Sequence, residues 1–133
     1  MIHLTSKNFR VNIFNDESFF DKEQNAYVFN DDVTINLGET AFFKNNFIVN
    51  GDLFTYNGIY IEGFQITKGN QYIRGYQCVR DRQVVGGNQI VEDYQVIGQN
   101  QYIEGSQIVK RHQVVKNHQF IKGGIIVRRP INE

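Results

Sequence analysis

The fold is decided by residues 65–124, which read QITKGN-QYIRGY-QCVRDR-QVVGGN-QIVEDY-QVIGQN-QYIEGS-QIVKRH-QVVKNH-QFIKGG. Gln opens each six-residue unit, ten times in succession without a slip. Two mostly apolar residues follow each Gln, and charged residues, glycine or other turn formers complete the unit. A strict period of this kind is the signature of a repeat architecture, so each unit predicts one short strand and one turn.

The two sides of each predicted strand carry different residues. Side chains alternate along a strand, so Gln and the residue two places after it share one face. From Ile73 to Val127, the residue two places after the Gln position is always β-branched. The residue between them varies in size, from the small Val84 to the large Tyr102. Uniform size favours the interior and variable size favours the outside, so we expect Gln to point inward.

The same slots are apolar toward both ends of the chain. Counting back in sixes from Gln65 and Thr67 gives two series that are apolar except for Thr55: Ile59, Leu53, Phe47, Ala41, Ile35 and Ile61, Thr55, Val49, Phe43, Leu37. After Gln119 the Gln slot becomes Ile125 and Ile131. The repeat therefore predicts stacked strands from about Ile35 to Ile131. Residues 1–32 do not fit the period, and we expect them to cap the first coil.

Glycine adds a second period, eighteen residues long, at 51, 69, 87, 105 and 123. Three units per turn make a three-sided coil with glycine at one corner, where a positive φ or tight packing is needed. Three intertwined chains would not require this spacing. The predicted fold class is all-β: a single-chain triangular β-solenoid with about eighteen residues per coil. Its domains are an N-terminal cap, residues 1–32, and a β-solenoid, residues 33–133, within one structural domain.

Eighteen residues per coil would align the glutamines in three ladders. These are Gln65, Gln83, Gln101, Gln119; then Gln71, Gln89, Gln107; then Gln77, Gln95, Gln113. Coils stack roughly 4.8 Å apart, a spacing at which each amide can donate to one neighbour and accept from the other. An unpaired buried amide costs about 1–3 kcal/mol, so an unbroken series is expected.

A six-residue period with three strands per coil resembles the left-handed β-helix of the hexapeptide-repeat proteins, many of which are acyltransferases and some carbonic anhydrases. It also resembles the bactofilins, right-handed solenoids that form filaments. The resemblance lies in the period, since Gln replaces the small residue of the usual hexapeptide unit. It would imply a trimeric enzyme with a histidine between subunits and a loop protruding from a coil.

The residues do not favour an enzyme. His112 and His118 lie in the outward position before Gln, and no unit between 59 and 127 is interrupted by a loop. A zinc site needs three converging ligands, and the third histidine, His3, lies in the expected cap. We therefore expect no catalytic residue, no metal ligand and no cofactor, and the sequence favours a role other than catalysis.

Charge and composition restrict the partners. Fourteen basic and fourteen acidic residues balance, but residues 105–133 hold six basic groups against one acidic group. Residues 1–50 hold seven acidic groups against four basic ones. The basic groups would point in several directions around a prism, which argues against nucleic acid. No segment reaches eighteen apolar residues, no signal peptide is recognised, and Cys78 has no disulfide partner, so we expect no membrane span and a cytoplasmic or virion-associated (phage) protein.

Outward apolar residues supply the functional hypothesis. They form columns along the predicted faces, and the candidate interface residues are Ile66, Val84, Tyr102, Phe120 on one face and Tyr72, Ile90, Ile108 on another. Contiguous apolar patches on a soluble protein commonly mark interfaces. We expect a non-catalytic structural or interaction protein that binds itself, as an oligomer or filament, or another protein. A protein inhibitor or immunity-type binder is the alternative, and a hexapeptide-repeat acyltransferase-like trimer comes third.

Overall fold

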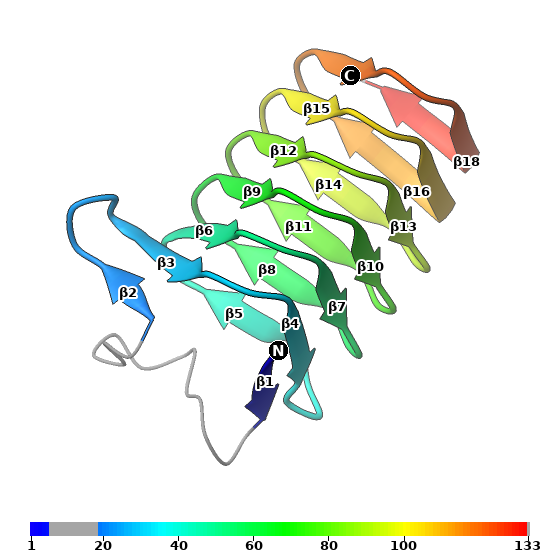
Figure 1. The fold of residues 1–133 in the computed structure, drawn as a ribbon. Helices are drawn as coiled ribbons and strands as arrows, with labels where there is room; N and C mark the ends of the chain where they lie inside the picture. Colours follow the sequence, from blue (N-terminus) through cyan, green and yellow to red (C-terminus); the bar gives the residue numbers. More distant parts are fainter. Residues whose placement is uncertain (6–18, 133) are drawn as a thin grey trace.

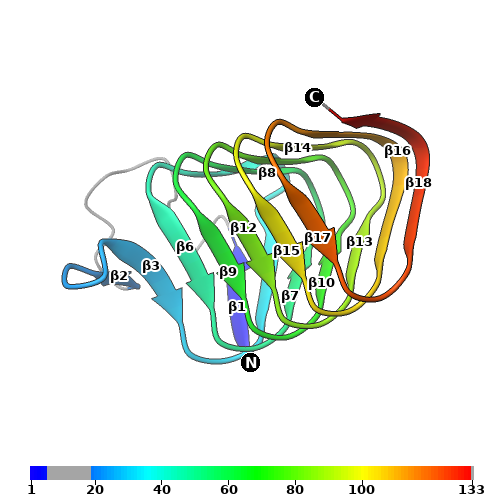
Figure 2. The ribbon, with the colours of Figure 1, turned by 90° about the horizontal axis from the view of Figure 1, so that it is seen from above.

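The computed structural model describes residues 1–5 and 19–132, which form a parallel β-solenoid without helices (Figure 1). The chain returns to the same face after three strands, and Gln71, Gln89 and Gln107 stack at eighteen-residue intervals. The described residues make about six coils, since one face holds six parallel strands. The coils follow one another along the axis (Figure 2). The predicted all-β solenoid, with its coil of about eighteen residues, is confirmed, as is the resemblance in period.

Each coil contributes one strand to each of three faces. Face 1 contains β1 (Ile2–Thr5), β4 (Val33–Asn36), β7 (Leu53–Thr55), β10 (Gln71–Ile73), β13 (Gln89–Val91) and the first halves of β16 (Gln107–Val115) and β18 (Ile125–Asn132). Face 2 contains β5 (Ala41–Phe43), β8 (Ile59–Ile61), β11 (Gln77–Val79), β14 (Gln95–Ile97) and the second halves of β16 and β18. Face 3 contains β2 (Phe20–Asp21), β3 (Ala26–Phe29), β6 (Asn46–Val49), β9 (Gln65–Thr67), β12 (Gln83–Val85), β15 (Gln101–Ile103) and β17 (Gln119–Ile121).

The interior has two chemically different parts. In the first coils, aromatic rings fill it, with centroids of Phe43 and Phe47 4.5 Å apart and those of Phe29 and Phe47 5.5 Å apart. From Gln65 onward, stacked glutamines and β-branched residues replace the rings, and the inward glutamines up to Gln113 are at most 2% exposed. The inward orientation of Gln is therefore confirmed.

The expected repeat frame is wrong before residue 41. Val33 stacks on Leu53, twenty residues later, whereas Ala41 stacks on Ile59, eighteen residues later. Two extra residues thus lie between β4 and β5, in a turn where Gly38 has a φ of 77°. Consequently Val33 occupies the slot expected for Ile35, and Leu37 lies outside the strand.

Parallel stacking continues N-terminal to this shift. β3 pairs with β6 on face 3, and β1 pairs with β4 on face 1, while β2 pairs with β3 in the antiparallel direction. Leu4 of β1 is 1% exposed and belongs to the core. That residues 1–32 serve as a cap stays a prediction, and residues 6–18 of that stretch lie outside the described part of the chain.

The last coil also departs from the strict repeat. Val127 lies opposite Val109, but Pro130 lies opposite Gln113, because β18 crosses the corner between the two faces with one residue fewer than β16. Ile131, expected in the inward slot, instead lies opposite the outward residue Val114.

Candidate interaction surface

The buried glutamines form one cross-linked column. Gln95 donates to Gln77 at 2.6 Å, and Gln113 donates to Gln95 at 2.8 Å, as the predicted ladder requires. However, Gln101 and Gln107, on the other two faces, also donate to Gln95, at 3.0 and 2.9 Å. Three separate ladders were expected, but the amides meet near the axis and share partners. Such a network stiffens the coils against one another.

All column bonds run in one direction. In each, the nitrogen belongs to the later residue and the oxygen to the earlier one. At the start of the column the side-chain nitrogens of Gln65 and Gln71 are buried without a partner. Gln71 accepts from the Thr67 hydroxyl at 2.9 Å, and Gln89 donates to Gln77 instead of Gln71. The expected Gln71–Gln89 link is therefore wrong. The column is neutral, and its members are buried up to Gln113, whereas Gln119 at its end is half-buried.

A second ladder lies at the corner between faces 3 and 1, and we call it the corner ladder. Its members are Asp32, Asp52, Asn70, Asn88 and Ser106. Each side-chain oxygen accepts a hydrogen bond from a backbone N–H of the next coil, as from Asn70 to Asp52 at 2.7 Å. The sequence carried this signal as Gly-Asp, Gly-Asn and Gly-Ser pairs eighteen residues apart, but only the glycines were recognised.

Tight packing explains the corner glycines. A Cβ atom on Gly87 would lie 2.4 Å from the Asn70 side-chain oxygen, and one on Gly105 would lie 2.3 Å from that of Asn88. In the described residues only Gly38 among the glycines has a positive φ, so backbone conformation is not the reason. At this corner the side chain of one coil fills the space beside the glycine of the following coil, so there is no room for a Cβ atom.

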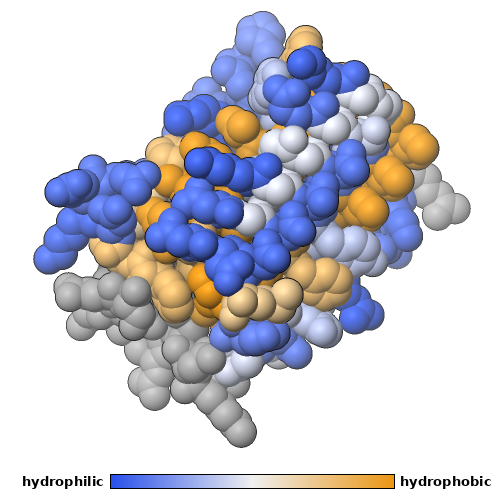
Figure 3. Space-filling view, viewed as in Figure 1, coloured by the Kyte–Doolittle hydropathy of each residue, from blue (hydrophilic) through white to orange (hydrophobic). Residues whose placement is uncertain are grey.

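The predicted interface residues lie where the sequence put them. Ile66, Val84, Tyr102 and Phe120 follow one another along face 3, and Tyr72, Ile90 and Ile108 along face 1. Most are half-buried between their neighbours, whereas Phe120 is 54% exposed. On the side seen in Figure 3, apolar patches lie between rows of hydrophilic residues. Whether these columns are interfaces stays a prediction.

Stacked rings make the apolar columns flat. Tyr102 and Phe120 lie 5.2 Å apart and 7° from parallel, and Phe54 and Tyr72 lie 5.0 Å apart and 4° from parallel. Because the rings face one another along the axis, their edges point outward. The columns can thus offer apolar contact, but the inner ring faces are not available to a planar ligand.

Charged side chains border face 1. The Tyr72 hydroxyl donates to Glu92 at 2.5 Å, and the Lys110 ammonium lies 3.0 Å from the other oxygen of that carboxylate. The hydrogen bond from Tyr72, with a smaller contribution from Lys110, lowers the pKa of Glu92, and it raises the pKa of Tyr72. These contacts join the side chains of Tyr72, Glu92 and Lys110 along the border of face 1.

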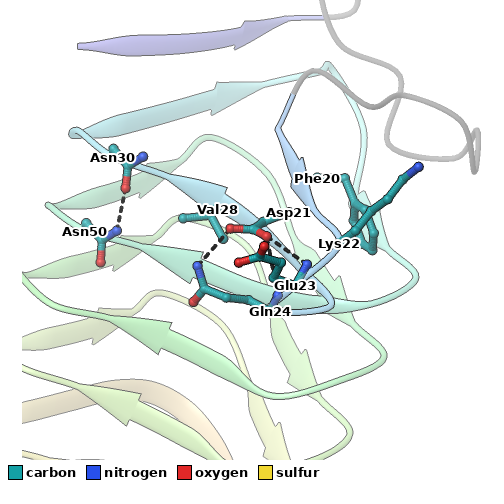
Figure 4. A pocket seen from close by; sticks show the side chains of 8 residues that line it. All are labelled: Phe20, Asp21, Lys22, Glu23, Gln24, Val28, Asn30 and Asn50. Atoms are coloured by element: carbon teal, nitrogen blue, oxygen red, sulfur yellow. Dashed lines mark hydrogen bonds between the residues drawn. The ribbon is translucent and has the colours of Figure 1, made fainter.

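Two hollows on the surface of the described residues bear on function. The first lies beside the β2–β3 hairpin (Figure 4), where Asp21 accepts from Gln24 at 3.0 Å and Asn50 donates to Asn30 at 2.7 Å. These hydrogen bonds engage four of the polar side chains that line the hollow, and the bond from Gln24 lowers the pKa of Asp21.

The second hollow runs along face 1 beside the corner ladder. Its apolar wall is formed by Phe54, Tyr72 and Ile90, and its polar lining includes Asp52, Asn70 and Asn88. Two of the predicted interface residues, Tyr72 and Ile90, therefore share a groove with corner side chains that sequence reasoning left out. A partner in this groove would meet apolar contact and hydrogen-bonding groups together.

The histidines of the last coils and the cysteine differ in exposure: His112 and Cys78 are half-buried, whereas His118 is exposed. His118 is exposed, and its backbone N–H donates to Asn100 at 3.1 Å; His112 has a buried Nδ1 without a hydrogen-bond partner. Burial raises the pKa of the half-buried Cys78, which makes the thiol less reactive. Across residues 1–5 and 19–132, no three His, Cys, Asp or Glu side chains come together to hold a metal ion.

In the part of the chain that the structure describes, no helix has the length and apolar character needed to cross a membrane.

Comparisons with known proteins identify no relative. No family model, no curated protein and no solved structure matches this chain.

Proposed function

We propose that the chain is a non-catalytic structural or interaction protein, a rigid rod that self-associates or docks another protein through its flat apolar columns. The observation that carries the proposal is the unbroken outward column on face 3, from Ile66 through Tyr102 to the exposed ring of Phe120. A cross-linked interior supports such a role, because a surface that does not deform loses little entropy on binding.

The size of one face suggests how it would bind. Six coils stacked at ~4.8 Å with strands of three residues give a strip about 29 Å long and about 10 Å wide. A standard interface buries about 800 Å² per partner, which is more than this strip offers. A contact through one face would therefore be weak alone, and strong association would need the neighbouring corners or several copies acting together.

Solution size tests the proposal. We expect the wild type to associate in a concentration-dependent manner in size-exclusion chromatography with light scattering. Phe120→Lys and Ile108→Lys should lower the assembly size while circular dichroism remains β-rich. Asn117→Lys is the matched control, since it adds the same charge at an exposed corner position outside the columns. A monomeric wild type in which these variants change nothing would remove self-association from the proposal.

A second candidate is a protein inhibitor or an immunity-type binder. The groove on face 1 favours it, because Phe54, Tyr72 and Asn70 there combine apolar and hydrogen-bonding groups. A monomer that retains a rigid surface would support this candidate. An acyltransferase-like trimer remains the third hypothesis, and a defined trimer in the same measurement would favour it.

A further inference from the structure

The interior of the solenoid does not distinguish one face from another. From Gln71 to Ile121 every unit presents Gln and a β-branched residue inward. The column accepts partners at several separations: Gln101 bonds to Gln95, six residues away, Gln107 to the same residue, twelve away, and Gln113, eighteen away. Moving a unit to the next face would thus keep the inward pattern. Some other feature must fix which face each unit occupies.

The corner ladder lies at one corner of each coil, and there it continues without a break through successive coils. Four successive bonds join Asp52 to Asp32 and then Asn70, Asn88 and Ser106 each to the member before it, at 2.7–2.9 Å. The glycines preceding these residues form a parallel series of backbone bonds: Gly69 to Gly51, Gly87 to Gly69, Gly105 to Gly87 and Gly123 to Gly105, at 2.8–3.0 Å. Both series need a residue without Cβ beside the ladder oxygen, as at Gly87.

The other two corners do not carry a continuous ladder. Where the chain passes from face 2 to face 3, the same kind of bond occurs singly, from the Phe64 N–H to Asn46 at 2.9 Å and from the His118 N–H to Asn100 at 3.1 Å. The series is broken between them, because Asp81 satisfies the Arg82 N–H with its own side chain at 2.9 Å. At the corner between faces 1 and 2, the rings of Tyr76 and Tyr94 stack 5.1 Å apart in the position that Asn70 and Asn88 hold on the ladder. A slip of one unit would bring such side chains over a corner that has room only for glycine.

We propose that the corner ladder is a register lock: it determines which face each unit occupies, and the glutamine column follows. The same requirement applies to the register of paired strands. If a shifted pairing keeps the core intact, the shifted form must be destabilised by contacts outside the core. A one-unit slip would break ladder bonds and push a Cβ atom toward an oxygen, whereas a slip of a whole coil would restore both.

Internal deletions separate the two lengths. Deleting residues 89–106 removes one coil and places Gly123 above Gly87, so we expect a β-rich protein with one cooperative urea transition. Deleting residues 89–94 removes a third as many residues but places Arg111 and His112 above Gly87 and Asn88. Its urea midpoint should fall below that of the longer deletion. A midpoint equal to or above it would overturn the proposal.

A rescue distinguishes register from lost contacts. In the six-residue deletion, Arg111→Gly with His112→Asn restores a Gly-Asn pair at the ladder corner, and the urea midpoint should rise. The same double substitution in the full-length chain lies at a different corner and should give no gain. If the deletion is not rescued, the lock lies elsewhere and the proposal is wrong. This comparison still decides the matter if the eighteen-residue deletion does not fold.

Discussion

The side-chain nitrogen of Gln95 lies 2.6 Å from the side-chain oxygen of Gln77, one coil nearer the N-terminus. The oxygen of Gln95 in turn accepts from three later glutamines. Gln95 therefore joins all three faces of the solenoid. Gln71 is its opposite, because its oxygen accepts from Thr67 and its nitrogen has no partner.

This contrast gives the first prediction. Gln95→Leu adds apolar character but leaves several buried amides with fewer partners, and we expect a loss of about 1–3 kcal/mol in the free energy of unfolding. Gln71→Leu removes one accepted bond and one unpaired donor, so its cost should be clearly smaller. Urea unfolding of both variants measures the difference. Equal losses in the two variants would mean that the hydrogen bonds of Gln95 stabilise the fold no more than those of Gln71.

The corner ladder gives the second prediction. Gly87→Ala places a Cβ atom 2.4 Å from the Asn70 oxygen and 3.0 Å from the Gly69 backbone, and the coils must separate or lose the bond. Overpacking of this kind costs about 1–3 kcal/mol. Gly124→Ala is the control, since its Cβ would meet nothing within 4 Å. Thermal or urea unfolding should separate the two, and a neutral Gly87→Ala would contradict the tight corner.

The third concerns pH. The Tyr72 hydrogen bond holds the pKa of Glu92 below its ordinary value, so the ionised carboxylate stabilises the fold above its unfolded pKa. That contribution is lost as pH falls through the lower, folded value. Tyr72→Phe should raise the pKa of Glu92 toward its ordinary range and reduce the loss of stability in acid.

An NMR titration of the Glu92 carboxyl group checks this directly. Tyr102→Phe removes the equivalent bond to Glu104 and serves as the control, because it should leave the Glu92 titration unchanged. A Glu92 pKa that does not move in Tyr72→Phe would show that Lys110 is the main cause of the shift.

The fourth prediction tests the cap. Leu4 is buried in β1, which covers the outer edge of β4. Leu4→Ala should lower the free energy of unfolding by about 2–5 kcal/mol and, by loosening β1, expose an edge that can pair with other chains. Light scattering should therefore rise in the variant. Destabilisation without any association would indicate that β1 contributes to packing but does not protect the edge.

The sequence predicted the solenoid, its coil length and the inward glutamines because those depend on periods that survive any local irregularity. It could not place Val33, since two residues inserted near Gly38 shift the frame without interrupting the apolar pattern. It also missed the one-residue slip at Pro130, which depends on how the last corner is crossed. The sequence also did not predict the hydrogen bonds from Gln101 and Gln107 to Gln95. A period along the chain does not show how far side chains from different faces extend toward the axis.

The common direction of the glutamine bonds gives the molecule an internal electric polarity. Since every amide donates toward the N-terminus, the carbonyl dipoles add along the axis, as peptide dipoles do in a helix. The positive end lies at Gln65 and Gln71, against the aromatic interior, and the negative end lies at Gln119. The exposed cations Lys116 and Lys122 lie in the coil that contains this negative end. The partial negative charge at this end opposes a small part of the basic surplus of residues 105–133 and so slightly lowers the cost of gathering like charges in the last coils.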